Sequence, residues 1–443
     1  MFDARLTSWN TCFLALVVSA SLTLAAPASV AQETADIDAA AESTDDASPS
    51  NSSEPAPLAD DAGDVEVGGP AAAEDSPASP EELPEEYRQE LQARIDQFRA
   101  KRQELEKAIG HQSEIYIRFL NGEQNSPEDR EAFTEQRNKV RAILDDAYLS
   151  ALSILQIGFD EEAATFMATM IQHRYGRDIY DAPTLEGAAR LVDGGSQLKY
   201  LFETAARSAV VCGEFEIAKK IYDAMLDENQ EEVDSRLEFN LDEYRKQFES
   251  EAELRKAERA EDRLPRVLFT TTQGDFVVEL FIDQAPSTVS HFIRLVEDGF
   301  YNGLDFFQVI DHLLALTGDP GGTGTGNCGQ FLRDEHARPG ARKALRGSLV
   351  MAKIPMPDDS NSFIPNSASS QFAILLLPIL TASEQQTVFG TVIGGMDVVS
   401  RLRRVDPYKE KKTGEVLYPP DSIIEATVLR RPEVLPEPEY VRP

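Results

Sequence analysis

Two segments of this chain combine large apolar residues with one glutamine each. Gln308 lies within Phe306–Ile310, and Gln371 lies within Ser370–Ile374. No cluster of His and Cys has metal-ligand spacing, and no glycine-rich loop of the P-loop kind is present. The sequence therefore predicts no metal and no other cofactor. The chemistry to look for is one that hydrogen-bonding side chains perform beside an apolar surface.

These two segments belong to an ordered series of short motifs between about residues 266 and 429. The series is Ala285–Val289, Gly299–Gly303, Gly318–Pro320, Asp334–Glu335, Gly347–Ala352, Ser370–Phe372, Val388–Gly390 and Gly395–Val399. Each motif alone is weak, but their order and spacing together are specific. This part of the chain, a little over a third of it, resembles the cyclophilins, a family of peptidyl-prolyl cis-trans isomerases. The resemblance implies a closed eight-stranded antiparallel β-barrel with two capping helices, acting on proline-containing polypeptides.

The resemblance also places the catalytic position. Rotation about a prolyl bond needs no nucleophile, because its barrier of about 18–20 kcal/mol reflects lost amide resonance. Cyclophilins lower the barrier with an arginine that donates to the prolyl nitrogen. Here that position is Gln308, and the histidine before it is Phe307. No Lys or Arg occurs between Arg294 and Arg333, so a small shift of register does not restore the cation.

The loss of charge has a predictable size. A hydrogen bond from a charged donor contributes about 1.5–3 kcal/mol and one from a neutral donor about 0.5–1.5 kcal/mol. Replacement of arginine by glutamine would then cost about 1–2 kcal/mol of transition-state stabilisation. This corresponds to a loss of rate of roughly tenfold or somewhat more. The alternative is that Gln308 is a polar residue of the barrel with no catalytic part.

The family's binding pocket is altered as well. Relative to the family pattern, Leu313 stands for a phenylalanine, Leu314 for a methionine, Leu316 for a glutamine and Ala373 for a second phenylalanine. Thr381 falls at a tryptophan position, Gln386 at a histidine position and Lys353 at an asparagine position, whereas Gln371, Ala352 and Phe372 are retained. The resemblance thus makes Gln308 and Gln371 the candidate catalytic residues. The candidate substrate-binding residues are Phe307, Leu313, Leu314, Leu316, Ala352, Lys353, Phe372, Ala373, Thr381 and Gln386.

Two functions follow from these residues. The first is an exported prolyl isomerase that acts in protein folding with reduced turnover. The second is an inactive prolyl-peptide-binding or scaffold protein, built on a cyclophilin-like barrel and a helical interaction region. In either case the helical region could carry a protein partner of its own.

Charge argues against one class of partner. The net charge is −34, from 77 acidic and 43 basic residues, and Gln32–Tyr87 alone holds 17 acidic residues and no Lys or Arg. Such a surface repels phosphate backbones, so no nucleic-acid partner is expected.

The N-terminus has the order of a secretory signal. The apolar run Cys12–Ala25 is shorter than the roughly 20 residues that span a bilayer, and Ser29–Ala31 offers a small-residue cleavage site. The pattern predicts a signal peptide over residues 1–31, a periplasmic or extracellular location, and no membrane span after cleavage. Residues 32–80 are rich in Ala, Ser, Pro, Asp and Glu, and we expect a disordered acidic linker.

The remaining chain divides by its hydrophobic period. Residues 81–262 follow a helical period, and Ser126–Asp129 predicts the start of a helix. Two similar stretches after Gly158 and Gly213 resemble tetratricopeptide repeats. The alternative is an ordinary helical bundle. Residues 227–262 are charged and helix-prone, and we expect them to form one connecting helix. Residues 265–430 then alternate with period 2 as a cyclophilin-like domain, which we expect to be independent of the helices. The predicted fold is α+β and multidomain, ending in a loose Pro-rich tail over residues 431–443.

Overall fold

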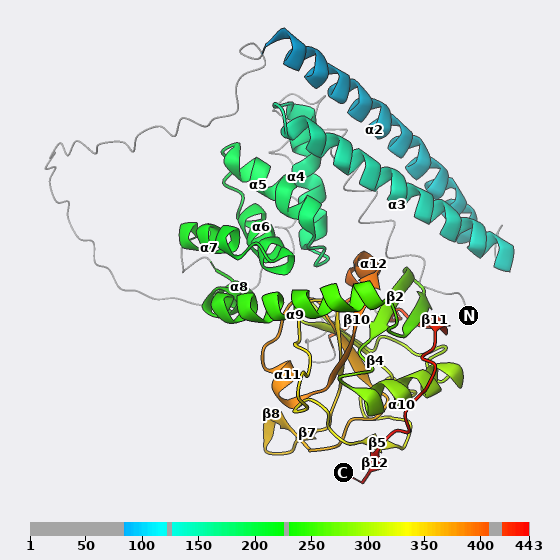
Figure 1. Cartoon of the computed structure of the whole chain (residues 1–443). Coiled ribbons are helices and arrows are strands. Elements are labelled where there is room, and N and C mark those ends of the chain that lie inside the picture. Colours follow the sequence, from blue (N-terminus) through cyan, green and yellow to red (C-terminus); the bar gives the residue numbers. More distant parts are fainter. Residues whose placement is uncertain (1–83, 122–125, 226–229, 407–418, 443) are drawn as a thin grey trace, which may run out of the picture.

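The computed structural model describes residues 84–121, 126–225, 230–406 and 419–442. An all-helical N-terminal region is followed by a C-terminal antiparallel half-barrel, and the long helix α9 runs across the junction between them (Figure 1). The predicted signal peptide over residues 1–31 and linker over residues 32–80 lie outside the described residues. No helix in the described ranges combines the length and apolarity needed to cross a membrane.

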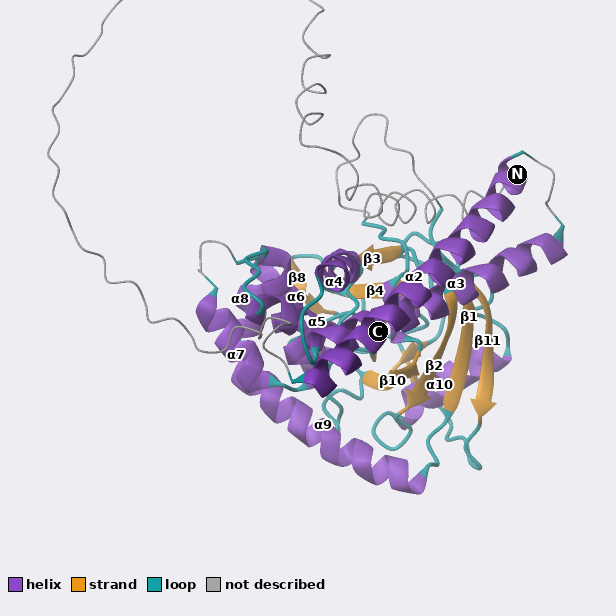
Figure 2. Cartoon of the chain, turned by 90° about the horizontal axis from the view of Figure 1, so that it is seen from above, coloured by secondary structure: helices purple, strands orange, loops and turns teal. Residues whose placement is uncertain are grey.

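The helical region contains eight helices in the described residues. They are α2 (Glu85–Leu120), α3 (Pro127–Leu155), α4 (Glu161–Tyr175), α5 (Ala182–Asp193), α6 (Lys199–Cys212), α7 (Phe215–Ala224), α8 (Glu232–Phe239) and α9 (Leu241–Glu261). Helices α2 and α3 form a long antiparallel hairpin that projects beyond the rest of the molecule (Figures 1 and 2).

The α2–α3 hairpin follows directly from its sequence. Leu91, Ile95 and Phe98 recur at helical spacing on α2 and are buried against the bundle. The predicted start of α3 is confirmed, because the Ser126 hydroxyl accepts from the Asp129 amide while the Asp129 carboxylate accepts from the Ser126 amide. This reciprocal capping box satisfies two backbone donors that the first turn leaves without helical partners.

The two stretches that resemble repeats begin α4 and α7, after the turns that join α3 to α4 and α6 to α7. Gly213 ends α6 in the left-handed region, with φ 82°, and a Cβ at this position would lie 2.4 Å from Cε1 of Phe248. Glycine is therefore required here both by the backbone and by the close approach of α9. Assignment of these stretches to a repeat family stays a prediction.

The predicted single connecting helix is wrong. The chain forms two helices, α8 and α9, which meet at Asn240. Charge pattern alone does not reveal this break, because both helices are rich in charged residues. The Asn240 side chain donates to the carbonyl of Arg236, which caps the end of α8.

The half-barrel is built from one large antiparallel sheet with the order β11-β1-β2-β10-β6-β9-β4-β3. The strands of this sheet are β1 (Arg266–Thr271), β2 (Gly274–Leu280), β3 (Gln308–Ile310), β4 (Leu314–Thr317), β6 (Ser348–Met351), β9 (Phe372–Leu375), β10 (Val388–Gly394) and β11 (Ile423–Arg430). Two smaller sheets pair β5 (Phe331–Leu332) with β12 (Tyr440–Val441) and β7 (Pro355–Met356) with β8 (Asp359–Phe363). The predicted β1–β2 hairpin is confirmed, and β11 lies beside β1 with Val267 opposite Val428.

The predicted closed barrel is wrong, because the sheet is open between its edge strands β11 and β3. The free edge of β3 is instead covered by Val405, which exchanges two backbone hydrogen bonds with Val309. The segment after the short helix α12 (Met396–Ser400) thus blunts an edge that another strand would otherwise complete.

The core of the half-barrel is aromatic. Phe269 stacks on Phe276 with ring centroids 4.9 Å apart, and Phe292 of α10 (Pro286–Glu297) contacts Phe372 and Phe389. The one-turn helix α11 (Ala382–Gln385) follows β9. Burial of these rings on one side leaves the outer face of β3, β4 and β9 for the candidate site.

The half-barrel is not independent of the helices, contrary to the prediction. Leu377 belongs to the core of the helical region rather than to that of the half-barrel. The buried Arg342 side chain pairs with Glu251 and Glu258 of α9. Arg137 of α3 donates to the carbonyl of Thr272 in the β1–β2 turn at 3.0 Å. The interface therefore combines apolar packing with buried charged contacts.

The C-terminal tail is ordered rather than loose. Tyr440 and Val441 pair with β5, and the Glu439 amide donates to the Ser287 hydroxyl at 2.7 Å. A proline-rich composition had indicated a loose tail, but these backbone partners fix its last residues.

Candidate active site

The candidate site begins with a row of residues across three strands. Gln308 of β3 lies opposite Leu316 of β4, and Leu316 lies opposite Ala373 of β9. Gln308 and Leu316 are half-buried, whereas Ala373 is buried. Among the described residues, none hydrogen-bonds to the side-chain amide of Gln308. The row therefore presents one amide beside small and branched apolar side chains.

The turn that joins β3 to β4 adds the other apolar residues. Leu313 ends the turn, where its amide donates to the carbonyl of Ile310 at 3.3 Å. Leu314 starts β4 opposite Leu375, and both Leu313 and Leu314 are half-buried. The structure thus brings together Gln308, Leu313, Leu314, Leu316 and Ala373 on one surface.

Gln371 holds a loop rather than offering a spare donor. Its Nε2 donates to the carbonyls of Gly324 and Gly326 at 3.0 and 2.7 Å. The same loop is held from beneath by Asp319, whose carboxylate accepts from three backbone amides, those of Gly321, Thr323 and Gly324. Burial would raise the pKa of Asp319, but these backbone donors lower it.

A cavity of about 230 Å³ opens beside Gln371. Ala352 and Lys353 line it together with Gly324, Asn327 and Ser369. Pro355 of the exposed strand β7 also lines the cavity, which is large enough to hold one side chain. It gives the site a second place to contact an extended peptide.

Lys353 does not supply the missing cation to Gln308. Its ammonium donates to the Asp334 carboxylate at 2.6 Å and to the Gln385 carbonyl at 3.1 Å. The side chain is only 3% exposed, so the ammonium is committed to this buried pair. Lys353 is a structural part of the wall between β6 and α11.

Two of the predicted binding residues are buried. Phe372 is fully buried in the aromatic core, because successive residues of a strand face opposite sides and its neighbours Gln371 and Ala373 face outward. Phe307 is buried too, with its ring beside Gly324. Phe372 therefore supports the site from behind, whereas contact of Phe307 with the substrate stays a prediction.

The last two predicted residues lie around α11. Thr381 precedes α11 and is exposed, so it provides no wall where the family pattern has a tryptophan. Gln386 ends α11 and donates to the carbonyl of Met351 at 3.2 Å. This rim of the site is therefore more open than the family pattern implies.

Comparison with known proteins identifies the family of the C-terminal part of the chain. Residues 266–428 match the family model described as cyclophilin type peptidyl-prolyl cis-trans isomerase/CLD. Over 149 residues the chain is 37% identical to the peptidyl-prolyl cis-trans isomerase-like 1 of Aspergillus fumigatus, covering 33% of this chain and 86% of that protein. The chain belongs to the cyclophilin family. A peptidyl-prolyl cis-trans isomerase of Helicobacter pylori is 34% identical over 138 residues, which is 31% of this chain and 78% of that protein.

A cyclophilin-type isomerase of Cryptosporidium parvum is also similar in structure. It is 26% identical with a TM-score of 0.32, over 38% of this chain and 99% of that chain. The match to the family model covers the half-barrel and does not include the helical region.

These relatives contradict the predicted export. Isomerase-like 1 proteins of fungi such as Aspergillus fumigatus, Neurospora crassa and Rhizopus delemar point away from a periplasmic or extracellular location. The prediction rested on the composition of residues 1–31 alone, and it was wrong.

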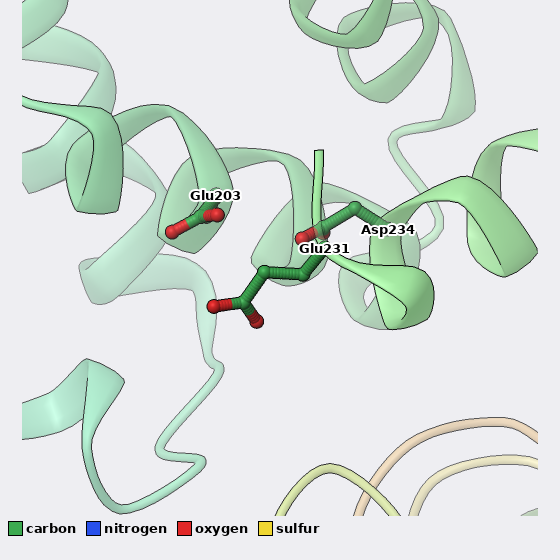
Figure 3. Close-up of side chains that lie close together, drawn as sticks. All are labelled: Glu203, Glu231 and Asp234. Atoms are coloured by element: carbon green, nitrogen blue, oxygen red, sulfur yellow. The ribbon is translucent and has the colours of Figure 1, made fainter. Parts of the chain in front are cut away.

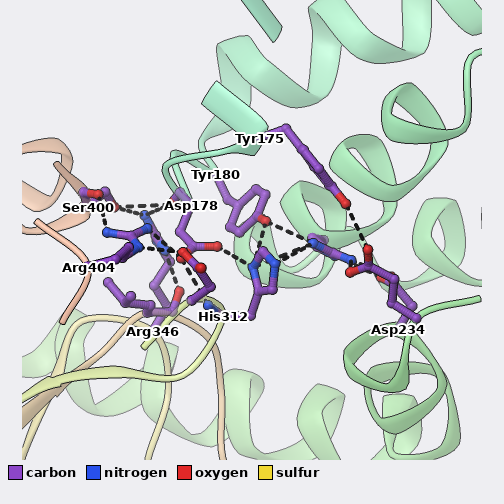
Figure 4. Close-up of polar contacts among 12 residues, drawn as sticks. Tyr175, Asp178, Tyr180, Asp234, His312, Arg346, Ser400 and Arg404 are labelled. Carbon is purple, nitrogen blue, oxygen red and sulfur yellow. Dashed lines mark hydrogen bonds and ion pairs between the residues drawn. The ribbon is translucent and has the colours of Figure 1, made fainter. Parts of the chain in front are cut away.

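The sequence did not reveal the contact that the helical region makes with the cyclophilin site. His312, in the β3–β4 turn, has φ 60°, and Asp178, between α4 and α5, has φ 55°. The Asp178 carboxylate accepts from the His312 amide at 2.9 Å and pairs with its Nδ1. Arg404 joins the same carboxylate at 2.8 Å (Figure 4). The pattern that could have drawn attention to the turn is Asp311–His312, two polar residues between two apolar runs.

The surroundings of Asp178 explain its ionisation. Burial would raise the pKa of this carboxyl, but hydrogen bonds from His312 and the charge of Arg404 lower the pKa to about 2. On the other side of the ring, Arg207 lies 3.3 Å from Nε2 of His312. Because an arginine can only donate, this contact places the imidazole proton on Nδ1, facing Asp178.

Beyond Arg207 lie three carboxylates, those of Glu203, Glu231 and Asp234 (Figure 3). Their oxygens lie within 4.8 Å of one another, a spacing that could hold a metal ion. Arg207, however, pairs with Asp234 and Glu231 at 2.5 and 2.7 Å, and Lys199 pairs with Glu203 at 2.9 Å. These two cations pair with all three carboxylates and offset two of their three charges, so the cluster fits an ion-pair network better than a metal site.

Proposed function

We propose that this protein is a prolyl isomerase of reduced turnover, acting on X-Pro bonds of other polypeptides. The observation that carries the proposal is the row Gln308, Leu316 and Ala373 across β3, β4 and β9, flanked by Leu313 and Leu314. It supports a proline ring lying on an apolar surface with one amide donor at its side.

In this proposal the residues act by binding and by hydrogen bonding alone. The proline ring packs on Leu313, Leu314 and Ala373, and the Gln308 amide donates to the prolyl nitrogen as that nitrogen becomes pyramidal. A neighbouring side chain of the same peptide occupies the cavity beside Gln371 and Ala352. The donor acts chiefly in the twisted state, where the nitrogen lone pair is available, so it lowers the barrier rather than only improving binding.

The second candidate is a prolyl-peptide-binding or scaffold protein without turnover, in which the helical region binds a protein partner. Its support is that the nearest cation predicted for the groove, Lys353, is committed to Asp334. A neutral amide and an apolar surface are sufficient to grip a proline, whether or not they accelerate its rotation.

One experiment separates the two candidates. Exchange NMR on a proline tetrapeptide would compare the wild type with Gln308→Leu, which keeps the approximate size of the side chain and removes the donor. The proposal expects measurable acceleration of cis-trans exchange by the wild type, its loss in the variant, and unchanged peptide affinity. Binding without any acceleration by the wild type would favour the scaffold.

A further inference from the structure

The β3–β4 turn adopts a conformation that an L-residue seldom holds without support. His312 has φ 60°, in the left-handed region, and it is followed at once by Leu313 and Leu314 of the prolyl surface. Strand β3 contains only Gln308–Ile310, so the turn forms a large part of this hairpin. A change in the conformation of the turn would therefore move Gln308 on one side and Leu313 and Leu314 on the other.

The support for the turn comes from the helical region. Asp178 accepts from both the backbone and the ring of His312, and it is completely buried. The cyclophilin domain in turn fixes Asp178, whose carbonyl accepts from Arg346 at 2.7 Å and from Ser400 at 3.0 Å. Because water does not reach this carboxylate, a contact that is lost here has no replacement.

A second layer of contacts orients the ring. Arg207 lies 3.3 Å from Nε2 of His312, and the Tyr180 hydroxyl lies 3.4 Å from Nδ1. Arg404 pairs with Asp178 (Figure 4). It also pairs with Asp311 of the same turn. The turn is thus held at His312 by groups of the helical region and at Asp311 by an arginine of its own domain.

We propose that His312 and Asp178 are positioning residues, through which the helical region sets the shape of the prolyl-binding surface. This inference rests on the proposed prolyl site, but it does not require turnover. The contact couples two events in both directions. Movement of the α4–α5 loop away from the turn loosens the site, and a peptide bound at the site holds the contact closed.

The test uses three variants of the full chain. His312→Gly keeps the left-handed turn accessible but removes the ring contact, and His312→Asn tolerates the same φ and restores a side-chain donor to Asp178. Arg137→Met is the matched control, because it removes a buried contact between the same two regions at the β1–β2 turn, away from β3 and β4. Peptide affinity is measured by NMR titration with a proline tetrapeptide, and hydrogen exchange is followed at residues 311–314.

The expected result is specific to the turn. His312→Gly should weaken peptide binding about tenfold, equivalent to 1.4 kcal/mol, and speed exchange at residues 311–314. His312→Asn should recover most of the affinity, and Arg137→Met should leave it unchanged. In the wild type, added peptide should slow exchange at the His312 amide.

Two outcomes would overturn the inference. Equal losses of affinity in His312→Gly and Arg137→Met would mean that general docking, rather than this contact, supports the site. Unchanged affinity in His312→Gly would mean that the turn holds its shape unaided. Absence of turnover in the wild type would refute only the proposed isomerase activity, because peptide affinity still reports on the positioning.

Discussion

At the scale of single residues, the function of this protein depends on which polar side chains remain available to a substrate. Gln371 and Gln386 both donate to backbone carbonyls, and Lys353 is held by Asp334. Gln308 is the predicted site residue whose amide has no partner among the described residues. In the proposed mechanism, Gln308 is therefore the neutral donor to the prolyl nitrogen.

The structural role of Lys353 is testable by Lys353→Met. Removal of one partner from a buried ion pair typically costs about 3–5 kcal/mol, and Asp334 would be left without its cation. We expect a loss of about 3 kcal/mol in the free energy of unfolding by urea, with kcat/KM of the folded protein nearly unchanged. A large fall in kcat/KM at full stability would instead identify Lys353 as a catalytic donor.

Asp178 predicts an acid-sensitive contribution to stability. Its pKa of about 2 in the folded protein lies below the ordinary value of 3.8. The stabilisation is therefore complete above about pH 4 and is lost as the pH falls toward 2. The difference in unfolding free energy between the wild type and Asp178→Asn should shrink by about 2 kcal/mol over this range. A constant difference between pH 5 and pH 2 would contradict the assigned environment.

Sequence reasoning proposed the residues of the prolyl surface but not the contacts that hold the β3–β4 turn. The positions of Gln308, Leu313 and Ala373 follow from motifs that are local in the chain. Asp178 and His312 are far apart in sequence, and the polar pair Asp311–His312 marks the turn without indicating its partner. Alternation along β9 also shows why Phe372, retained from the family pattern, faces the core.

At the scale of elements, the sequence pattern predicted those elements whose formation depends on residues close together in the chain. The capping box of α3, the β1–β2 hairpin and helix α10 each carry their signal within a few residues. The break between α8 and α9, the cover of β3 by Val405 and the pairing of the tail with β5 depend on partners distant in the chain. Those features were the ones that the sequence missed.

The end of α6 offers a test of an element boundary. Gly213 and Gly195 both have positive φ, but a Cβ at Gly213 would lie 2.4 Å from Phe248, whereas a Cβ at Gly195 would meet open space. Gly195→Ala should therefore cost about 1 kcal/mol of backbone strain, and Gly213→Ala should cost about 1–3 kcal/mol more because of the overpacking. Equal losses in thermal unfolding experiments would show that α9 does not approach α6 as closely as described.

At the scale of the whole molecule, the helical region and the cyclophilin domain share one interface. Leu377, from the segment after β9, packs in the core of the helical region, close in sequence to Thr381 at the rim of the site. The two regions were expected to be independent because their hydrophobic periods differ. A change of period marks a change of secondary structure, but it does not show which surfaces the two regions bury against each other.

The shared interface predicts shared stability. Leu377→Ala removes a buried side chain and should cost about 2–5 kcal/mol. Hydrogen exchange should then accelerate in the helical core as well as in β9. Faster exchange confined to the half-barrel would mean that the two regions unfold separately.

The central claim, that this is a cyclophilin whose turnover is limited by a neutral donor, is tested most directly by Gln308→Arg. We would measure kcat/KM for cis-trans exchange of a proline tetrapeptide, with peptide affinity measured in parallel. The account predicts a rise of about tenfold with affinity little changed, because the apolar surface of Leu313, Leu314 and Ala373 is untouched. A wild type that already matches an arginine-bearing cyclophilin, or a variant with no gain, would contradict it.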